Sequence, residues 1–587
     1  MKLTDYIAQF LLNKGITDVF GYQGTMIAHL VDSISHTPGL ANHSAYHEQG
    51  AAFAACGYAQ MSGGCAAAYA TSGPGAANLL SGIADAYFDS LPVLFFTGQL
   101  NTYEYSGVEG LRQQGFQEID IVSMAGPVTK YAVQIREPER IAAELEKAYR
   151  IAMEGRRGPV LLDLPMNIQR AEVEIQAPEQ EAEGLYEPAG QTGPEEAADS
   201  IIQALNQSQR PVILMGSGMK ADGRQALIHM ARSLSIPVVT SVPACSFLAF
   251  DDPVYFGCLG GAYGHRKANM IAGAKSDLLL CFGISLCTRQ IGTKVHEFAK
   301  NARIIRLDID RANLSRQIHQ GGEGEQSFLT DANKTAVYLD QLQMRGGMLK
   351  QGISFEKWFE TAGIIRDELD RLDRDLPARF PNRAVEELSG FLKDAEAVGV
   401  DVGQHMVWTY QSFRHRRGQR LLFSGGHGAM GYGLPAAIGA YYACRKPVAC
   451  ICGDGAFQMN IQELQWVVRE KIPIRIIVMN NQSLGMILHL QRDYFSDCYE
   501  GTAPEGGFTS GSFARIAEAY GIRAAAVKLQ DGESRSAFAC LEEEGPLLLE
   551  IRMEPGTYAY PKTCLGEPIY NQQPYIPKEI FDRLLAL

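Results

Sequence analysis

Short apolar runs alternate with longer amphipathic stretches along most of this chain. Residues 65–70 form a strand-like run of small side chains, residues 76–88 read as a helix, and residues 92–96 form the next strand-like run. Ahead of them, residues 5–14 carry a helical pattern that ends at Gly15. Strands that alternate with helices predict βαβ units, and therefore a parallel sheet.

This alternation restarts twice, which divides the chain into three blocks. Residues 172–195 are rich in Glu, Gln, Pro and Gly, which is typical of a solvated linker between the first two blocks. A helical stretch at residues 355–373 leads into the third block. Strand-like runs of the middle block lie at residues 211–215, 237–240, 278–282 and 303–308. We expect an α/β protein with three doubly wound parallel-sheet domains, at residues 1–172, 190–345 and 376–587.

Polar residues follow two apolar runs of the third block. Gly453-Asp454-Gly455 follows the run 447–452, Asn480-Asn481 follows the run 474–479, and a helix is predicted between them at residues 460–471. Parallel strands bring both polar ends to the same carboxyl edge of a sheet, where ligands bind in open α/β proteins. Asp and Asn oxygens are hard ligands of the kind that Mg²⁺ prefers, and Mg²⁺ held this way commonly keeps a diphosphate.

Composition narrows the class of protein. The chain has 587 residues and a formal net charge of -13, so it lacks the basic excess of a general nucleic-acid-binding protein. Its 12 cysteines are scattered without a C-x-x-C pair, which favours small buried side chains in a reducing compartment. The N-terminus carries an early acid, and no apolar run approaches the ~20 residues of a membrane span. We therefore expect a cytoplasmic protein with no membrane or nucleic-acid partner.

Further motifs extend the picture. They include His47-Glu48-Gln49, Thr71-Ser72-Gly73-Pro74-Gly75-Ala76, Phe116-Gln117-Glu118, Asp401-Val402-Gly403-Gln404-His405 and the segment 428–437. Together with the polar strand ends, they resemble the acetolactate synthase-like branch of thiamine-diphosphate (ThDP) enzymes over residues 4–549. A lone Glu48 in the first turn of an Ala-rich helix would be explained by the helix dipole. Beside the other motifs, it is the predicted catalytic carboxylate.

The resemblance implies a role for each matching residue. Glu48 is the carboxylate at pyrimidine N1′, Met430 is the wedge that bends the cofactor, and the Gly428 carbonyl holds the pyrimidine amino group. The catalytic residues are Glu48, Gln117, Phe116 and Lys130, and the Mg²⁺ ligands are Asp454, Asn481 and Ser483. The cofactor-binding residues are Gly24, Thr71, Pro74, Asn78, Gln404, His405, Gly428, Met430, Gly453, Gly455, Ala456, Gly485 and Met486. In this family the cofactor lies between the first block of one subunit and the third block of another, which implies a homodimer or homotetramer.

The middle block raises the question of a flavin, because acetolactate synthases hold FAD there. Gly216, Gly218, Arg289 and Asp308 match the positions that the resemblance assigns to FAD. The family's acidic pair before the Arg is replaced by Cys287-Thr288. The alternative is a middle domain that only supports the dimer.

The resemblance also implies the reaction, a carboligation in which pyruvate is decarboxylated and its acetyl unit is joined to a 2-keto acid or another ketone. Biosynthetic acetolactate synthases carry a Trp where this chain has Leu490, so 2-ketobutyrate is not expected to be the main acceptor. A lyase, hydrolase or decarboxylase acting on a diketone or 2-keto acid uses the same cofactor and stays an alternative. The resemblance leaves open whether a regulatory subunit joins.

Two readings of another class are disfavoured. The segment 426–431 fits G-x-G-x-x-G, with Asp454 some twenty residues on, which is the outline of a dinucleotide fingerprint. That reading leaves Glu48 and Asn480-Asn481 without a role. A binding protein on a decayed enzyme scaffold is disfavoured because Glu48, Asp454 and Asn481 are intact.

Overall fold

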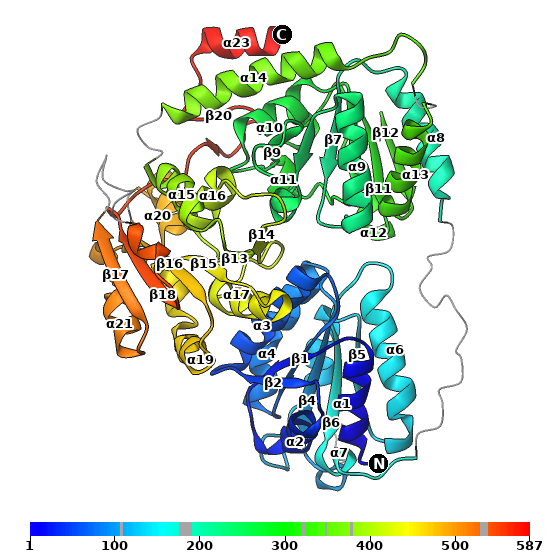
Figure 1. Cartoon of the computed structure of the whole chain (residues 1–587), viewed down its shortest axis with the longest axis vertical. Coiled ribbons are helices and arrows are strands. Elements are labelled where there is room, and N and C mark those ends of the chain that lie inside the picture. Colours follow the sequence, from blue (N-terminus) through cyan, green and yellow to red (C-terminus); the bar gives the residue numbers. More distant parts are fainter. Residues whose placement is uncertain are drawn as a thin grey trace. The chain divides into compact units, whose positions relative to one another are not determined.

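The computed structural model describes residues 1–105, 108, 110–174, 191–319, 324–346, 349–375, 380–496, 498–528 and 538–587. The predicted linker lies largely outside the described residues. Within them the chain forms three parallel six-stranded sheets with flanking helices (Figure 1), which confirms the predicted fold class. The chain divides into two compact units, one of residues 1–186, 394–406 and 422–556, the other of residues 187–393, 407–421 and 557–587. The predicted domain limits stay a prediction.

The first sheet lies in the first unit and has the strand order β2-β1-β3-β4-β6-β5. All five of its strand pairs are parallel. Its strands are β1 (Asp18–Gly21), β2 (Ala41–Ser44), β3 (Ala66–Ala70), β4 (Val93–Gln99), β5 (Tyr131–Gln134) and β6 (Val160–Pro165). Its main helices are α1 (Leu3–Asn13), α2 (Ala28–His36), α3 (Glu48–Ser62), α4 (Pro74–Phe88), α5 (Ile121–Ala125), α6 (Ile141–Met153) and α7 (Met166–Gln169). β3 and β4 are buried along their whole length, as expected of central strands with both faces covered.

The third sheet has the strand order β14-β13-β15-β16-β18-β17. Its strands are β13 (Ala397–Val400), β14 (Arg420–Phe423), β15 (Val448–Gly453), β16 (Ile474–Asn480), β17 (Arg523–Lys528) and β18 (Leu547–Arg552). The helices along residues 380–519 are α15 (Phe380–Phe391), α16 (Gln404–Ser412), α17 (Gly433–Cys444), α18 (Asp454–Gln458), α19 (Leu464–Arg469), α20 (Gly485–Tyr494) and α21 (Phe513–Ala519). β15 and β16 pair in parallel, so the ends at Gly453 and Asn480 lie at one edge, as predicted.

The helix predicted between β15 and β16 is observed over residues 461–469, with a different type of first turn. The predicted single helix over residues 460–471 is a 3-10 turn at Ile461–Glu463 followed by α19. The Glu463 side chain turns away to accept hydrogen bonds from the backbone of Tyr46, in the first domain.

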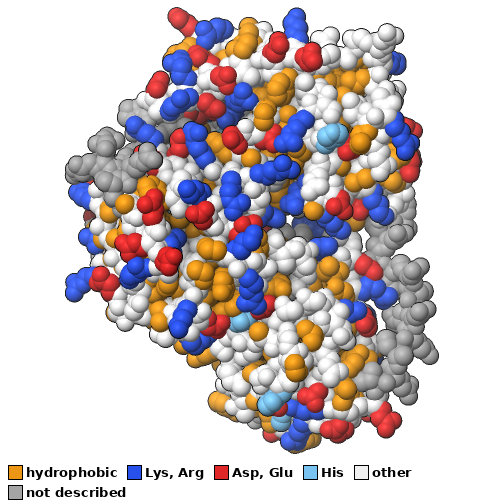
Figure 2. All heavy atoms as spheres, viewed as in Figure 1, with side chains coloured by type: hydrophobic (Ala, Val, Ile, Leu, Met, Phe, Trp, Pro, Cys, Tyr) orange, Lys and Arg blue, Asp and Glu red, His pale blue; other side chains and the backbone are white. Residues whose placement is uncertain are grey.

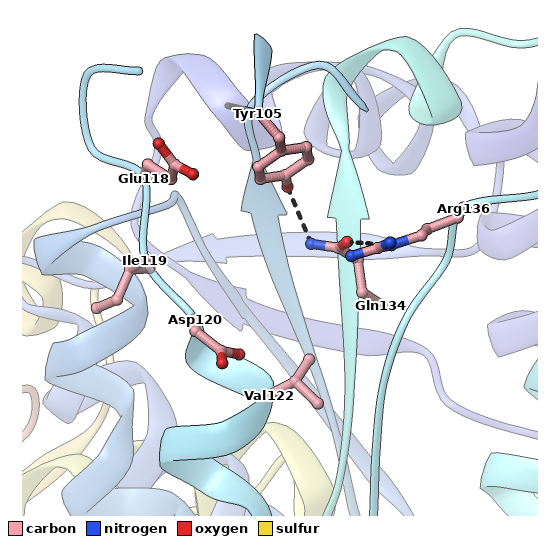
Figure 3. Close-up of a pocket in the computed structure, with 7 residues that line it drawn as sticks. All are labelled: Tyr105, Glu118, Ile119, Asp120, Val122, Gln134 and Arg136. Carbon is pink, nitrogen blue, oxygen red and sulfur yellow. Dashed lines mark hydrogen bonds between the residues drawn. The ribbon is translucent and has the colours of Figure 1, made fainter. Parts of the chain in front are cut away.

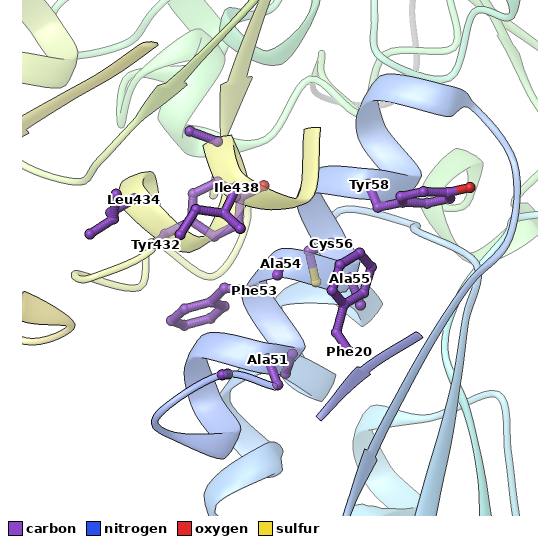
Figure 4. Close-up of a cluster of buried hydrophobic side chains, with 14 of the residues drawn as sticks. Phe20, Ala51, Phe53, Ala54, Ala55, Cys56, Tyr58, Tyr432, Leu434 and Ile438 are labelled. Atoms are coloured by element: carbon purple, nitrogen blue, oxygen red, sulfur yellow. The ribbon is translucent and has the colours of Figure 1, made fainter. Parts of the chain in front are cut away.

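Helices α3 and α17 join the first and third sheets within the first unit (Figure 4). The two helices cross closely because each offers a glycine: a Cβ on Gly57 would lie 2.1 Å from the Ala436 carbonyl oxygen, and one on Gly439 would lie 1.8 Å from that of Ala54. Beside the crossing, the rings of Phe53 and Tyr432 meet edge to face at 5.5 Å. The shared core fixes the orientation of α3, which starts at Glu48.

The middle sheet lies in the second unit, with the order β12-β11-β10-β7-β8-β9 and parallel pairing throughout. Its strands are β7 (Pro211–Met215), β8 (Val238–Thr240), β9 (Tyr255–Cys258), β10 (Leu278–Phe282), β11 (Arg303–Asp308) and β12 (Glu325–Leu329). Its helices are α8 (Pro194–Leu205), α9 (Ala221–Leu234), α10 (Arg266–Met270), α11 (Thr288–Ile291), α12 (Arg311–Leu314), α13 (Ala332–Met344) and α14 (Glu356–Arg374). The C-terminal residues, including β19 (Lys562–Thr563), β20 (Gln572–Gln573) and α23 (Lys578–Ala586), belong to this unit.

No helix among the described residues is long and apolar enough to cross a membrane. Basic and acidic side chains are interspersed over the face drawn in Figure 2, in keeping with the net charge of -13.

A buried cluster of charged side chains around His43 connects the first and third sheets. His43 on β2 contacts Asp18 through Nε2 at 2.8 Å and Glu470 through Nδ1 at 3.0 Å, and its ring stacks on Tyr442 at 3.7 Å. Arg445 also donates to Asp18, at 2.6 Å. Burial alone would lower the pKa of His43, but the two carboxylates outweigh it and raise that pKa above its usual value. The imidazolium, with a donor on each nitrogen, is therefore the form that joins the two domains.

We expect His43→Gln to lower the free energy of unfolding by about 1–3 kcal/mol near pH 6 and by less at pH 9. Because the pKa of His43 is higher in the folded than in the unfolded protein, its charged form stabilises the fold fully at pH values below the unfolded-state pKa of about 6.5. This stabilisation is lost as the pH rises through the folded-state pKa. The pKa of Glu470 is lowered to about 2, so this carboxylate is charged at both pH values. Urea unfolding of both proteins at pH 6 and pH 9 measures the effect. His229→Gln, which removes an exposed histidine 2.6 Å from Asp340, is the control; equal losses for His43→Gln at both pH values would contradict the charged form.

Candidate functional site

Glu48 stands at the start of α3, near the carboxyl edge of the first sheet. The His47 imidazole caps this helix by accepting from the Gln49 amide at 3.1 Å. The Glu48 carboxylate is 8% exposed, and its Oε2 accepts from Asn78 on α4 at 3.0 Å. Its Oε1 lies over Gly75, where an added Cβ would be only 3.1 Å away. α4 therefore orients the carboxylate, and the turn before α4 leaves room for it.

Most of the other residues predicted on the cofactor's pyrimidine side gather here. Gly24 lies against Thr71, since a Cβ on it would be 2.5 Å from the Thr71 Cβ. The Thr71 hydroxyl accepts from the Met26 amide at 3.2 Å. Pro74 is the first residue of α4, and Gly73 before it has φ 59° and packs against Gln117, which itself has φ 65°. We call Gly24, Glu48, Thr71, Pro74, Asn78 and Gln117 the pyrimidine-side half-site.

Two other predicted catalytic residues, Phe116 and Lys130, are not part of this half-site. Phe116 is 79% exposed, next to Gln117 in the chain. The Lys130 ammonium donates to the Glu154 carbonyl at 2.7 Å and to the Ile151 carbonyl, at the C-terminal end of α6. Burial lowers the pKa of Lys130 to about 8. The structure thus gives Lys130 a helix-capping contact, and its catalytic role stays a prediction.

A cavity lies beside this half-site (Figure 3). It has a volume of about 320 Å³ and is lined by Tyr105, Glu118, Ile119, Asp120, Val122, Gln134 and Arg136. Gln134 donates to Tyr105 at 2.9 Å and to the buried Asp163 at 2.8 Å. Burial raises the pKa of Asp163 to about 6. The cavity adjoins the Gln117 segment but includes neither Glu48 nor any predicted metal ligand.

The predicted metal and diphosphate residues meet at the carboxyl edge of the third sheet. Asn481, after β16, donates its amide to Gln404 at the start of α16 at 3.0 Å. Gly485 fits beneath both, since a Cβ on it would lie 2.0 Å from Gln404 Oε1. Gly453 packs in the same way against His405, since a Cβ on it would lie 2.7 Å from His405 Nδ1. We call Gln404, His405, Gly428, Met430, Gly453, Asp454, Gly455, Ala456, Asn481, Ser483, Gly485 and Met486 the diphosphate-side half-site.

Asp454 has the environment of a cation ligand. It is 2% exposed, and its Oδ2 has no hydrogen-bond partner among the described residues. Burial raises the pKa of Asp454 to about 6, against the hydrogen bonds from its surroundings that lower it. The Ser483 hydroxyl is likewise buried without a hydrogen bond in the described part of the chain. An unsatisfied buried carboxylate is costly, and a cation would satisfy it.

The oxygen atoms available at this site fit a hard cation that is bound by few charged side chains. No cluster of three His, Cys, Asp or Glu residues suited to a metal occurs among the described residues. Asn481 commits its nitrogen to Gln404, which leaves its oxygen for a cation beside Asp454. Mg²⁺ is commonly bound by one or two protein oxygens together with substrate phosphates, and the residues here fit that pattern.

A loop at residues 424–433 carries Gly428 and Met430. Gly428 has φ 72°, and the Met430 methyl reaches to 3.5 Å from the position of a Cβ on Gly455. Asp401 accepts from the amides of Gly431 and Gly433 at 2.9 Å each, which fixes the end of the loop. The same carboxylate occupies the start of α17, where a dinucleotide fingerprint would place its pyrophosphate. The local structure therefore gives no support to the fingerprint reading.

Sequence reasoning missed Glu463, which supports the start of α3 from the third domain. Both of its carboxylate oxygens accept from the Tyr46 amide, at 3.2 and 3.1 Å. Burial raises its pKa to about 7. An acid inside the apolar stretch 461–468 was the only signal in the sequence.

The predicted flavin residues belong to the second unit. Gly216 and Gly218 follow β7, Asp308 is the last residue of β11, and Arg289 lies on the short α11 after β10. Gly216 packs against the Gly283 backbone, since a Cβ on it would lie 1.9 Å from that carbonyl. Asp308 accepts from the Asp310 amide at 2.9 Å. All four therefore lie at or just beyond the carboxyl ends of three neighbouring strands.

Comparison with known proteins identifies three domains of one enzyme family along most of the chain. It matches the thiamine pyrophosphate enzyme N-terminal TPP binding domain at residues 1–124, the central domain at 198–337 and the C-terminal TPP binding domain at 401–551. The acetolactate synthase isozyme 2 large subunit of Escherichia coli (strain K12) is 32% identical over 559 residues, 94% of this chain and 96% of that protein. The acetolactate synthase large subunit of Lactococcus lactis subsp. lactis (strain IL1403) is 32% identical over 569 residues, 95% and 94% of the two chains. Acetolactate synthase 1, chloroplastic, of Zea mays is 32% identical over 566 residues, 94% and 85% of the two chains.

Proposed function

Because this chain belongs to the thiamine pyrophosphate enzymes and is an enzyme of the acetolactate synthase type, we propose that it is a ThDP- and Mg²⁺-dependent carboligase that uses pyruvate as donor. The observation that carries the proposal is the buried Glu48 carboxylate, held by Asn78 in the same chain as the unsatisfied Asp454 oxygen. The acceptor is a 2-keto acid or another ketone.

Each half-site would contribute its own part of the chemistry. Bound ThDP supplies the carbon acid and electron sink for decarboxylation and ligation. Glu48 would hold a proton at the pyrimidine nitrogen, and its burial keeps water from competing for it. Asp454, the Asn481 oxygen and the Ser483 carbonyl would hold Mg²⁺, while Met430 and the Gly428 carbonyl would position the pyrimidine. Gln117 and Phe116 would orient the reacting carbonyls.

The two half-sites would combine between chains. Among the described residues, no hydrogen bond or ion pair joins Glu48 to Asp454, Asn481 or Ser483. A homodimer or homotetramer, in which Glu48 of one subunit faces Asp454 of another, supplies a complete site. The relatives from Escherichia coli and Lactococcus lactis are large subunits, so activity of the purified chain alone also tests whether a further subunit is needed.

We also propose FAD in the middle domain, where it would have a structural role. Gly216 and Gly218 let the backbone turn closely past Gly283, as a nucleotide-binding edge requires. Cys287 and Thr288 replace the family's acidic pair, and this replacement favours weak FAD binding or none. The visible absorption spectrum of the purified protein decides: no flavin band after saturation with FAD would leave a purely supporting domain.

The acceptor should not be mainly 2-ketobutyrate, because Leu490 on α20 stands where the biosynthetic relatives' Trp shapes the acceptor pocket. Leu490 is 44% exposed on this chain. With pyruvate and 2-ketobutyrate at equal concentrations, we expect 2-aceto-2-hydroxybutyrate to be a minor product by mass spectrometry. Leu490→Trp should raise its share about tenfold, the scale of one methylene's discrimination in an apolar pocket. Tyr494→Trp, at another exposed position of α20, is the control.

Dominance of 2-aceto-2-hydroxybutyrate in the wild-type reaction would refute this assignment. Pyruvate alone separates the other reactions of this cofactor. Acetolactate or acetoin indicates ligation, acetaldehyde indicates simple decarboxylation, and no turnover favours lysis or hydrolysis of a diketone.

A further inference from the structure

The start of the loop that carries Gly428 and Met430 is held by the first domain. Asp89, which caps the C-terminus of α4, accepts from the Gly425 amide through Oδ2 and from the Gly426 amide through Oδ1, at 2.7 Å each. One turn earlier on α4, Asp85 accepts from the Ser424 hydroxyl. That hydroxyl in turn accepts from the Ala429 amide at 2.9 Å. Three backbone amides of the loop thus depend, directly or through Ser424, on two carboxyl groups of α4.

Packing leaves this loop little freedom at the contact. Asp85 and Ser424 are both fully buried. A Cβ on Gly426 would lie 2.7 Å from the Phe88 Cβ, and the Phe88 ring stacks on His427 with centroids 5.9 Å apart. The loop therefore follows the end of α4 closely, rather than meeting it through one adjustable side chain.

The same helix orients the catalytic carboxylate. Asn78 in the second turn of α4 donates to Glu48, and Asp89 lies about three turns further along, about 16 Å at 1.5 Å per residue. A rigid helix transmits a fixed spacing between its ends. α4 thus touches one predicted catalytic element at each end.

We propose that Asp85 and Asp89 are positioning residues for ThDP: they fix residues 424–429, and so set where the Gly428 carbonyl and the Met430 side chain meet the cofactor. This inference rests on the proposed function. Asp401 and Asn460 hold the other end of the loop from within the third domain, so the α4 contact supplies the second anchor. With one anchor, the backbone around Gly428 could rotate about Gly431.

The two carboxyl groups differ in what the contact requires of them. Asp89 uses both oxygens, one for each amide, so replacing one oxygen by an NH₂ group opposes a backbone N–H with another donor. Asp85 uses Oδ1 alone toward Ser424. Burial and the nearby Asp89 raise the pKa of Asp85 well above its usual value, so a neutral side chain suits that position. Asp89→Asn should therefore disrupt the contact, whereas Asp85→Asn keeps an oxygen that can accept from the Ser424 hydroxyl.

A matched control exists in the second unit. Asp277 accepts from the amides of Gln209 and Arg210 through its two oxygens, at 2.8 Å each, the same arrangement as at Asp89. Asp277→Asn removes a comparable backbone contact outside both half-sites. Comparing the two variants separates a loss of stability from a loss of positioning.

The experiment measures hydrogen exchange, stability, ThDP affinity and pyruvate kinetics on the full-length chain. In the apoprotein, Asp89→Asn should speed amide exchange in the peptide covering residues 424–431 by about tenfold or more. It should weaken Mg²⁺-dependent ThDP binding and lower kcat by about 10–100-fold each, as loss of a supporting contact does, with little change in KM for pyruvate. Asp277→Asn should keep ThDP affinity and kcat within about twofold, the ordinary scatter for remote sites.

Several outcomes would overturn the inference. Asp89→Asn with faster exchange but unchanged ThDP affinity and kcat would make the contact purely structural, as would equal losses in Asp277→Asn. If Asp89→Asn does not fold, Ser424→Ala, which removes only the Asp85 arm, must show the exchange and affinity changes for the inference to stand. A wild-type protein that binds no ThDP overturns the proposed function and the inference with it, whereas the exchange result in the apoprotein still reports whether α4 holds the loop.

Discussion

Glu48→Gln should lower kcat with pyruvate by about 10²–10⁴-fold, the range for losing a positioned acid–base group, while ThDP still binds. The amide keeps the size and the Asn78 contact of the carboxylate but cannot hold the proton at the pyrimidine nitrogen. Deuterium exchange at C2 of enzyme-bound ThDP, measured by NMR after acid quench, reports the affected step directly.

The control for this variant is Glu144→Gln. Glu144 is also buried in the first domain, at 5% exposed, and accepts from Tyr131 on β5 and Arg140. It should lose some stability and keep the C2 exchange rate. An exchange rate in Glu48→Gln equal to that of the wild type would refute the role assigned to Glu48.

Asp454→Ala should have opposite effects on binding and on stability. Mg²⁺-dependent ThDP affinity should fall by about 100-fold or more, because a metal ligand and its charge are lost. The apoprotein should become more stable by about 1–3 kcal/mol, because an unsatisfied buried carboxylate oxygen is removed. Fluorescence titration with ThDP and Mg²⁺ and urea unfolding without them measure the two effects.

The combination identifies a ligand site more sharply than either effect alone. A structural aspartate would lose stability on truncation, as Asp401→Ala should, because Asp401 accepts from three backbone amides. An apoprotein destabilised by Asp454→Ala, together with unchanged ThDP affinity, would show that Asp454 is part of the fold and not of the metal site.

The sequence was sufficient wherever the controlling interactions are short-range. Strand runs such as 211–215, 278–282 and 303–308 match the observed β7, β10 and β11, because apolar runs bounded by turn residues specify buried parallel strands locally. The edge positions of Gly453 and Asn481 followed from strand–helix–strand connectivity alone. Glu48, Asp454 and their motifs also sufficed for the family, which the comparisons confirm.

Only the tertiary structure decided which side chains meet across long separations in the chain. Asn78 against Glu48, Glu463 against Tyr46, His43 between Asp18 and Glu470, and Asp89 against the 424–429 loop all depend on how α3, α4 and α17 pack. Packing also turned the Lys130 ammonium toward the end of α6. These contacts join residues tens to hundreds of positions apart, and their geometry follows from interlocked cores, which local periodicity does not encode. The sequence therefore determined the elements and the chemistry they carry, while the close crossing at Gly57 and Gly439 and the packing around it decided how that chemistry is held.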